Sequence, residues 1–152
     1  MFLLNLKDPE VQARFYDLIK KADVLVENYR PGVAKRLGID FETLHEINPK
    51  LVYVSFSAYG QNDPRSLDAL HDINIVAKTG YYDLTKGAVA LLQPADLSAA
   101  MVGLQGALTG LSPEMKQAEL ISMFQCMTLS SGGTPCLIAV GFSMVKTYFR
   151  NA

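Results

Sequence analysis

Three side chains in the middle of the chain could carry out proton transfer or nucleophilic attack. His71 is followed directly by Asp72, and an imidazole that titrates near neutrality beside an orienting carboxylate suits proton transfer. Asp96 begins a glycine-rich helical pattern, where a carboxylate could act as a nucleophile or as an acid–base group. The alternative for Asp96 is an ordinary helix N-cap, a position that aspartate fills well. We take His71 and Asp96 as candidate catalytic residues, and Asp72 as the group that orients His71.

Three basic residues near the N-terminus could hold the phosphates of a ligand. Arg30 and Arg36 flank a turn that contains Pro31 and Gly32, and the guanidinium fork binds two phosphate oxygens at once. Lys7 precedes the first helical pattern and could act in the same way. Solvated surface charge is the alternative interpretation of all three residues.

The elements that would position these residues alternate between helix and strand. Apolar residues recur with helical spacing over residues 9–22 and 41–47. Residues 23–27 and 51–57 are rich in apolar and β-branched residues, which is typical of buried parallel strands. This order of elements predicts an α/β layer.

The helix starts carry recognisable signals. Asp8 can cap the first helix, and Pro9 suits its first position because proline lacks the backbone N–H that would be unpaired there. Asp40 can cap the second helix, which should end before the Asn48-Pro49 pair. Both helices are therefore predicted to begin at an aspartate.

Polar turns follow the two predicted strands and mark the place where a ligand should bind. Residues 28–32 and 58–64 contain glycine, proline and polar side chains. In open α/β sheets, ligands bind outside the carboxyl ends of the strands. His71 lies just beyond the second turn, so it is predicted to lie near the same end of the sheet.

A third helix is predicted from Asp96 onward, with many small residues on one side. Each glycine costs a helix about 1 kcal/mol relative to alanine, so its glycines indicate a close approach of another backbone or of a ligand. Close helix–helix packing is the preferred explanation. The small residues are Ala99, Ala100, Gly103, Gly106, Ala107 and Gly110, and the larger apolar stripe beside them is Leu97, Met101, Leu104, Leu108 and Leu111.

The C-terminal part offers two further short strands, at 119–124 and 136–140. Cys126 and Cys136 have neither the spacing of metal ligands nor the density of a disulfide-rich secreted protein. We expect buried thiols in a reducing cytoplasm and no metal site.

The composition excludes several classes of protein. The chain has 152 residues, of which 49% are hydrophobic and 19% charged, with a net charge of −1. This balance fits a cytoplasmic globular protein and leaves no basic excess for nucleic acid. The charge-free stretch 120–145 is interrupted by polar residues, glycine and proline, so we expect no membrane span. The sequence lacks the P-loop, the dinucleotide-binding glycine motif, the zincin motif and the serine hydrolase elbow.

The order of the motifs strongly resembles that of the family III CoA-transferases. This family includes formyl-CoA and carnitine CoA-transferases and the alpha-methylacyl-CoA racemases, and the resemblance is dense over residues 4–108. It rests on five segments: LNLK (4–7), VENYRPG (26–32), YVSFSAYGQ (53–61), HDIN (71–74) and ADLS (95–98).

The resemblance implies that the substrate is an acyl-CoA. Coenzyme A would be part of that substrate, and no covalently bound cofactor is expected. Asp96 matches the aspartate that, in the transferases, attacks an acyl-CoA to give an anhydride and then an aspartyl thioester. The residues that match segments holding the adenosine and phosphate parts of CoA are Leu4, Asn5, Leu6, Lys7, Asn28, Tyr29, Arg30 and Arg36.

Two reactions and one non-catalytic role are compatible with the resemblance. In the racemases the matching aspartate pairs with a histidine, here His71, across the α-carbon of a 2-methylacyl-CoA. One group removes the α-proton and the other returns it on the opposite face. Because the HDIN segment resembles the racemases more than the formyl-CoA transferases, racemase-like proton exchange is the first hypothesis. CoA transfer through Asp96 is the second, and a non-catalytic remnant or subunit-binding fragment is the third.

The resemblance also implies a fold and an assembly. We expect an α/β fold with a partial Rossmann-like open parallel sheet and flanking helices, incomplete relative to the family. Residues 1–112 would form a partial CoA-binding domain, and residues 113–152 the start of a linker or second-domain region. Members of the family form interlocked dimers, so a homodimer is expected.

Overall fold

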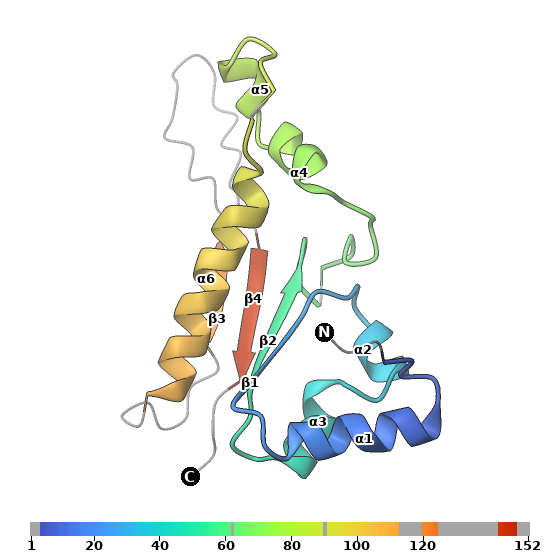
Figure 1. Cartoon of the computed structure of the whole chain (residues 1–152). Coiled ribbons are helices and arrows are strands. Elements are labelled where there is room, and N and C mark those ends of the chain that lie inside the picture. Colours follow the sequence, from blue (N-terminus) through green and yellow to red (C-terminus); the bar gives the residue numbers. More distant parts are fainter. Residues whose placement is uncertain (1–3, 62, 90, 113–119, 125–142, 149–152) are drawn as a thin grey trace.

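A computed structural model of the chain describes residues 4–61, 63–89, 91–112, 120–124 and 143–148 (Figure 1). None of the helices in these ranges is long and apolar enough to cross a membrane. The predicted strand at 136–140 and both cysteines, Cys126 and Cys136, lie outside the described residues. The helices are α1 (Pro9–Ile19), α2 (Val33–Arg36), α3 (Phe41–Ile47), α4 (Asp72–Lys78), α5 (Tyr81–Leu84) and α6 (Pro94–Leu111), and the strands are β1 (Val24–Glu27), β2 (Val52–Ser57), β3 (Leu120–Phe124) and β4 (Ser143–Tyr148).

The described strands form one mixed sheet in the order β1-β2-β4-β3. β1 and β2 are parallel, with Val24 opposite Val52 and Val26 opposite Val54. β4 runs antiparallel to both of its neighbours. The predicted α/β class and the parallel β1–β2 pair are confirmed, and the antiparallel β4 is an addition that the expected parallel sheet did not include.

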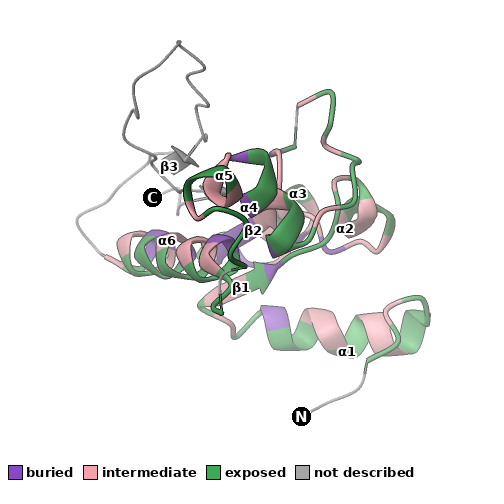
Figure 2. Cartoon of the chain, turned by 90° about the horizontal axis from the view of Figure 1, so that it is seen from above, coloured by how far each residue is buried: buried purple, intermediate pink, exposed green. Residues whose placement is uncertain are grey.

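β2 is the centre of the core because helices cover both of its faces (Figures 1 and 2). Its first four residues are all buried, as expected for a strand between two layers. Each fully buried side chain of this size contributes about 1.5–3 kcal/mol through the hydrophobic effect. The core on the α1 and α3 side comprises Ile19, Ile39, Leu44, Leu51 and Tyr53, and on the α6 side it includes Val52 and Val54.

Both predicted aspartate caps are confirmed. The Asp8 carboxylate accepts a hydrogen bond from the Glu10 amide at 3.0 Å, and α1 begins at the next residue, Pro9. The Asp40 carboxylate accepts from the Thr43 amide at 3.4 Å and from its hydroxyl at 2.9 Å. Burial favours the protonated form of Asp40, but these hydrogen bonds outweigh it and lower the pKa of that carboxyl.

α6 packs on the sheet through its small residues. A Cβ placed on Gly103 would overlap the ring of Phe56 on β2, and Gly106 and Gly110 are also buried. The close approach predicted from the glycines is therefore confirmed, but the neighbour at Gly103 is a strand residue rather than the second helix that we expected. The larger apolar stripe lies on the opposite side of the helix and is 46–60% exposed: Leu97, Met101, Leu104, Leu108 and Leu111.

Candidate active site

Asp72 connects α4 to the start of α6. Its carboxylate is buried, and Oδ1 accepts hydrogen bonds from the amides of Ala95 at 2.7 Å and Asp96 at 3.1 Å. These amides belong to the first turn of α6, where backbone N–H groups have no partner within the helix. Gln93, at the N-cap position, makes no capping hydrogen bond with its side chain. Asp72 therefore provides from another helix the acceptor that an N-cap would normally supply.

This arrangement corrects the expected position of Asp96. The sequence suggests that Asp96 opens the helix as a possible N-cap, but α6 begins at Pro94 and Asp96 is its third residue. The Asp96 side chain is exposed, and its carboxylate makes no hydrogen bond or ion pair with the residues that the structure describes. Asp72 therefore caps α6 in place of the Asp96 carboxylate.

His71 lies at the N-cap position of α4, directly before Asp72. Its backbone amide donates to Asn74 Oδ1 at 3.4 Å, and its side chain is exposed. In the described part of the chain, Asp72 bonds to α6 rather than to the imidazole, so the expected orientation of His71 by Asp72 is not observed. His71 directly precedes Asp72, and Asp72 accepts a hydrogen bond from the Asp96 amide. The backbones of both candidate catalytic residues are therefore next to the contact between α4 and the start of α6.

Asn28, Tyr29 and Arg30 follow the carboxyl end of β1, and all three are exposed. The turn that they form is tied back to the strand because the buried Glu27 accepts a hydrogen bond from the Tyr29 amide at 2.7 Å. The carboxyl ends of β1 and β2 lie at the same edge of the sheet because the strands are parallel. Asn28–Arg30 and the segment that leads to His71 therefore leave the sheet at one edge.

The segment Leu4–Lys7 forms the approach to α1. Asn5 accepts from the Lys7 amide through its side chain at 3.3 Å and from the Asp8 amide through its carbonyl at 2.9 Å. Leu4 and Lys7 are exposed, whereas Leu6 packs against the core beside α1. Within this predicted CoA-binding segment, Leu6 therefore has a structural contact that explains its apolar side chain.

Arg36 ends α2 and is held by a pinned turn, defined here as residues 37–39. The Leu37 carbonyl accepts from Gln12 Nε2 at 2.8 Å and the Gly38 carbonyl from the Tyr16 hydroxyl at 2.9 Å, both side chains lying on α1. The Ile39 carbonyl accepts from the Tyr53 hydroxyl on β2 at 2.9 Å. The position of the Arg36 backbone is thereby determined by both α1 and the sheet.

Gly38→Ala is expected to lower the free energy of unfolding by about 1–3 kcal/mol. Gly38 has φ +66°, and an added Cβ would lie 2.7 Å from Gln12 Nε2 and 2.8 Å from the Tyr16 hydroxyl, the two groups that hold the turn. The control is Gly32→Ala, because Gly32 has φ +81° and open space around the new Cβ. Urea unfolding of both variants measures the difference. An equal loss of unfolding free energy in both variants would show that the positive φ accounts for the effect and that the overlap with Gln12 and Tyr16 adds nothing to it.

The second histidine lies away from this region. His45 lies on α3, where its ring stacks on Phe41 with centroids 4.9 Å apart and its Nδ1 is buried without a hydrogen-bond partner among the described residues. Within the same residues, no group of three or more histidine, cysteine or acidic side chains is arranged to hold a metal ion.

Comparison with known proteins agrees with the motifs. The model of CoA-transferase family III matches residues 1–125. The acetyl-CoA:oxalate CoA-transferase of Acetobacter aceti is 46% identical over 78 residues, covering 51% of this chain and 20% of that protein. Human alpha-methylacyl-CoA racemase is 40% identical over 78 residues, with the same two coverages. A crystal structure of a CaiB/BaiF family protein from Brucella suis superposes with a TM-score of 0.62 at 29% identity, covering 69% of this chain and 30% of that one.

The chain spans only 20–30% of the length of these three proteins. The family match nevertheless extends over most of this chain, and it includes every candidate residue discussed above. The chain belongs to CoA-transferase family III.

Proposed function

We propose that this chain takes part in CoA transfer between an acyl-CoA and a carboxylic acid, with Asp96 as the nucleophile. The observation that carries the proposal is the exposed Asp96, whose carboxylate makes no hydrogen bond or ion pair with the described residues, on a helix start that Asp72 holds in place. The relatives support transfer more than racemisation, since one is an acetyl-CoA:oxalate CoA-transferase and another a succinyl-CoA:glutarate CoA-transferase.

The chemistry begins with attack of an Asp96 carboxylate oxygen on the thioester carbonyl carbon. CoA leaves as the thiolate, and a mixed anhydride remains on Asp96. The thiolate then attacks the aspartyl carbonyl, which releases the first acid as a carboxylate and leaves CoA as an aspartyl thioester. An acceptor carboxylate then attacks the aspartyl thioester, which releases the CoA thiolate and gives a second anhydride. The thiolate attacks the acceptor's carbonyl carbon in this anhydride, which forms the new acyl-CoA and frees the Asp96 carboxylate. Splitting the transfer in this way replaces one difficult step by easier ones.

The nucleotide part of CoA would bind at the edge where β1 ends. Exposed Asn28–Arg30 and Arg36 offer amide and guanidinium donors there, and Leu4–Lys7 adds the lysine ammonium. Guanidinium groups bind phosphate oxygens with charge-assisted hydrogen bonds. These residues would hold CoA without a covalent bond. We also propose that the whole protein is a homodimer.

A second candidate is α-proton exchange on a 2-methylacyl-CoA, with His71 and Asp96 as the two acid–base groups. The observation that favours it is that Asp72, the residue directly after the exposed His71, accepts a hydrogen bond from the Asp96 amide, so the two candidate residues belong to helix starts that are in contact. General acid–base groups typically contribute 10²–10⁴-fold each. Under this alternative, Asp72 acts by placing Asp96 and not by orienting His71.

Covalent trapping tests the first proposal. The chain is incubated with acetyl-CoA, quenched with hydroxylamine and digested for mass spectrometry. We expect an aspartyl hydroxamate at Asp96, absent in Asp96→Asn and retained in the control Asp83→Asn, which removes an exposed aspartate on α5. An unmodified Asp96 in the wild-type chain contradicts the transfer mechanism.

A parallel incubation with a 2-methylacyl-CoA in deuterated water separates the two candidates. Deuterium at the α-carbon that disappears in His71→Gln would support proton exchange. If the chain shows neither chemistry and CoA does not raise its melting temperature, the non-catalytic interpretation is supported, because a ligand that binds the native state must stabilise it.

A further inference from the structure

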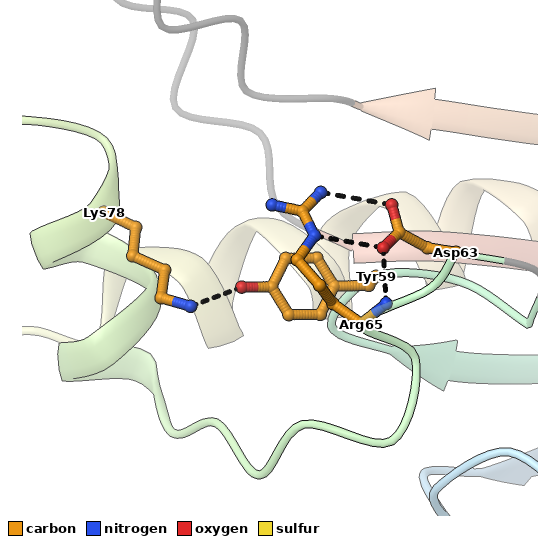
Figure 3. Close-up of polar contacts among 4 residues, drawn as sticks. All are labelled: Tyr59, Asp63, Arg65 and Lys78. Carbon is orange, nitrogen blue, oxygen red and sulfur yellow. Dashed lines mark hydrogen bonds and ion pairs between the residues drawn. The ribbon is translucent and has the colours of Figure 1, made fainter.

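Two cations gather around Tyr59 just after β2 (Figure 3). The Lys78 ammonium donates a hydrogen bond to the Tyr59 hydroxyl at 2.6 Å. The Arg65 guanidinium carbon lies 4.3 Å from the centroid of the Tyr59 ring, over its face. One tyrosine therefore holds a lysine at its hydroxyl end and an arginine over its ring, which brings together two charges from separate parts of the chain.

The Arg65 guanidinium is fixed in direction by Asp63. Nε and Nη2 of Arg65 bond to the two carboxylate oxygens at 3.0 and 3.1 Å, and the Arg65 amide bonds to Oδ1 at 2.8 Å. These bonds hold the pKa of Asp63 below its usual value and raise that of Arg65. In Figure 3 the remaining terminal nitrogen of Arg65 points away from Asp63 and makes no hydrogen bond to the other residues drawn. Arg65 is thereby oriented while one of its nitrogens stays available.

Lys78, unlike Arg65, has no carboxylate partner among the described residues. In the part of the chain that the structure describes, its ammonium bonds to the Tyr59 phenol and to no carboxylate. An ammonium carries three donors, so two are left for a ligand. A lysine anchored on a phenol, with an oriented guanidinium nearby, favours an oxyanion such as a carboxylate.

The location of the cluster connects it to the candidate active site. Tyr59 follows the carboxyl end of β2, and Lys78 is the last residue of α4, whose first residue, Asp72, holds the start of α6. With a rise of 1.5 Å per residue, α4 separates the backbones of Lys78 and His71 by about 10 Å. A short acyl chain and the long lysine side chain together can cover that distance.

We propose that Lys78 and Arg65 form a carboxylate-binding subsite for the far end of a dicarboxylic acyl group. The subsite lies apart from Asn28–Arg30 and Arg36 along the chain, and it would distinguish an acyl chain that ends in a carboxylate from one that ends in a methyl group. The inference rests on the proposed CoA chemistry at Asp96 and deepens it by naming a class of acyl group.

The test compares two thioesters of the same chain length, succinyl-CoA and butyryl-CoA, by titration calorimetry on the 152-residue chain. We expect the wild-type chain to bind succinyl-CoA about tenfold more tightly, the size of one good charge-assisted contact. Lys78→Met should remove this preference and leave the affinity for butyryl-CoA unchanged. The control is Lys50→Met, an exposed lysine at the opposite end of β2, which should retain the preference.

Three outcomes would overturn the inference. An unchanged ratio of the affinities for succinyl-CoA and butyryl-CoA in Lys78→Met shows that the lysine does not bind the carboxylate of the acyl chain. An equal loss of affinity for both thioesters assigns the lysine to a phosphate of CoA instead. Failure of the wild-type chain to bind either thioester removes the proposed function as well, which distinguishes that failure from the first two.

Discussion

Replacing Asp72 with alanine is expected to lower the free energy of unfolding by about 3 kcal/mol. The substitution removes the acceptor for the amides of Ala95 and Asp96, and an unpaired buried donor costs about 1–3 kcal/mol, with more lost where the partner is charged. The negative charge at the N-terminus of α6 is lost as well, a favourable interaction with the helix dipole. Urea unfolding measures the change, and the hydroxamate at Asp96 should fall with it, since the first turn of α6 is no longer held.

Asp72→Asn is the matched control. Its amide oxygen can still accept from both backbone amides, so we expect a loss of about 1 kcal/mol from the missing charge and retention of the Asp96 adduct. If Asp72→Ala and wild type unfold at the same urea concentration, the tie between α4 and α6 is not a stabilising contact. A stable Asp72→Ala chain with full labelling would likewise show that Asp96 needs no support from α4.

Gly103→Val is expected to cost 3 kcal/mol or more, about the upper end of what overpacking in a core produces. The added Cβ alone would overlap the Phe56 ring, and the two further methyl groups cannot be accommodated without moving α6 away from β2. Since α6 carries Asp96, the start of the helix should move too. Thermal unfolding followed by circular dichroism measures the loss.

Ala100→Val separates overlap from helix propensity. Ala100 lies on α6 three residues earlier and is exposed. Valine there should lower the free energy of unfolding only through its lower helix propensity, by about 0.5 kcal/mol. A similar loss for both substitutions would contradict close packing of α6 on the sheet.

The parts of the fold that sequence reasoning predicts well are those with local causes. The aspartate caps at Asp8 and Asp40 are set by residues within three positions of the helix start. β2 could be recognised because burial on both faces leaves a nearly continuous apolar run, and β1 because its apolar and β-branched residues stop at a polar turn. The predicted strand at 119–124 corresponds to β3.

The parts that could not be predicted depend on tertiary contacts. α6 starts two residues before Asp96 because a carboxylate 23 residues away supplies its cap. β4 was not predicted, because its sequence SMVKTY mixes polar and apolar residues and the strand lies between two others only through pairing with β2 and β3. α1 ends at Ile19, three residues before the predicted Ala22.

The candidate site shows the same division. Residue type and motif order predict His71 and Asp96 as candidates, whereas the contact of Asp72 with α6 depends on which two helices meet. One sequence signal was available, a helix beginning at Gln93-Pro94 with no capping side chain of its own. The cluster at Tyr59 had no such signal, because its cations lie 6 and 19 residues away from the tyrosine in sequence and nothing in their spacing indicates contact.

The pinned turn after α2 makes the placement of Arg36 depend on α1. Two of its three carbonyls are held by Gln12 and Tyr16, side chains on a helix that contributes no candidate ligand-binding residue of its own. Under the proposed function, the placement of Arg36, and with it the affinity for CoA, depends on positions outside the binding site. Under that proposal, substitutions at Gln12 and Tyr16 would change the affinity for CoA although neither residue would contact it.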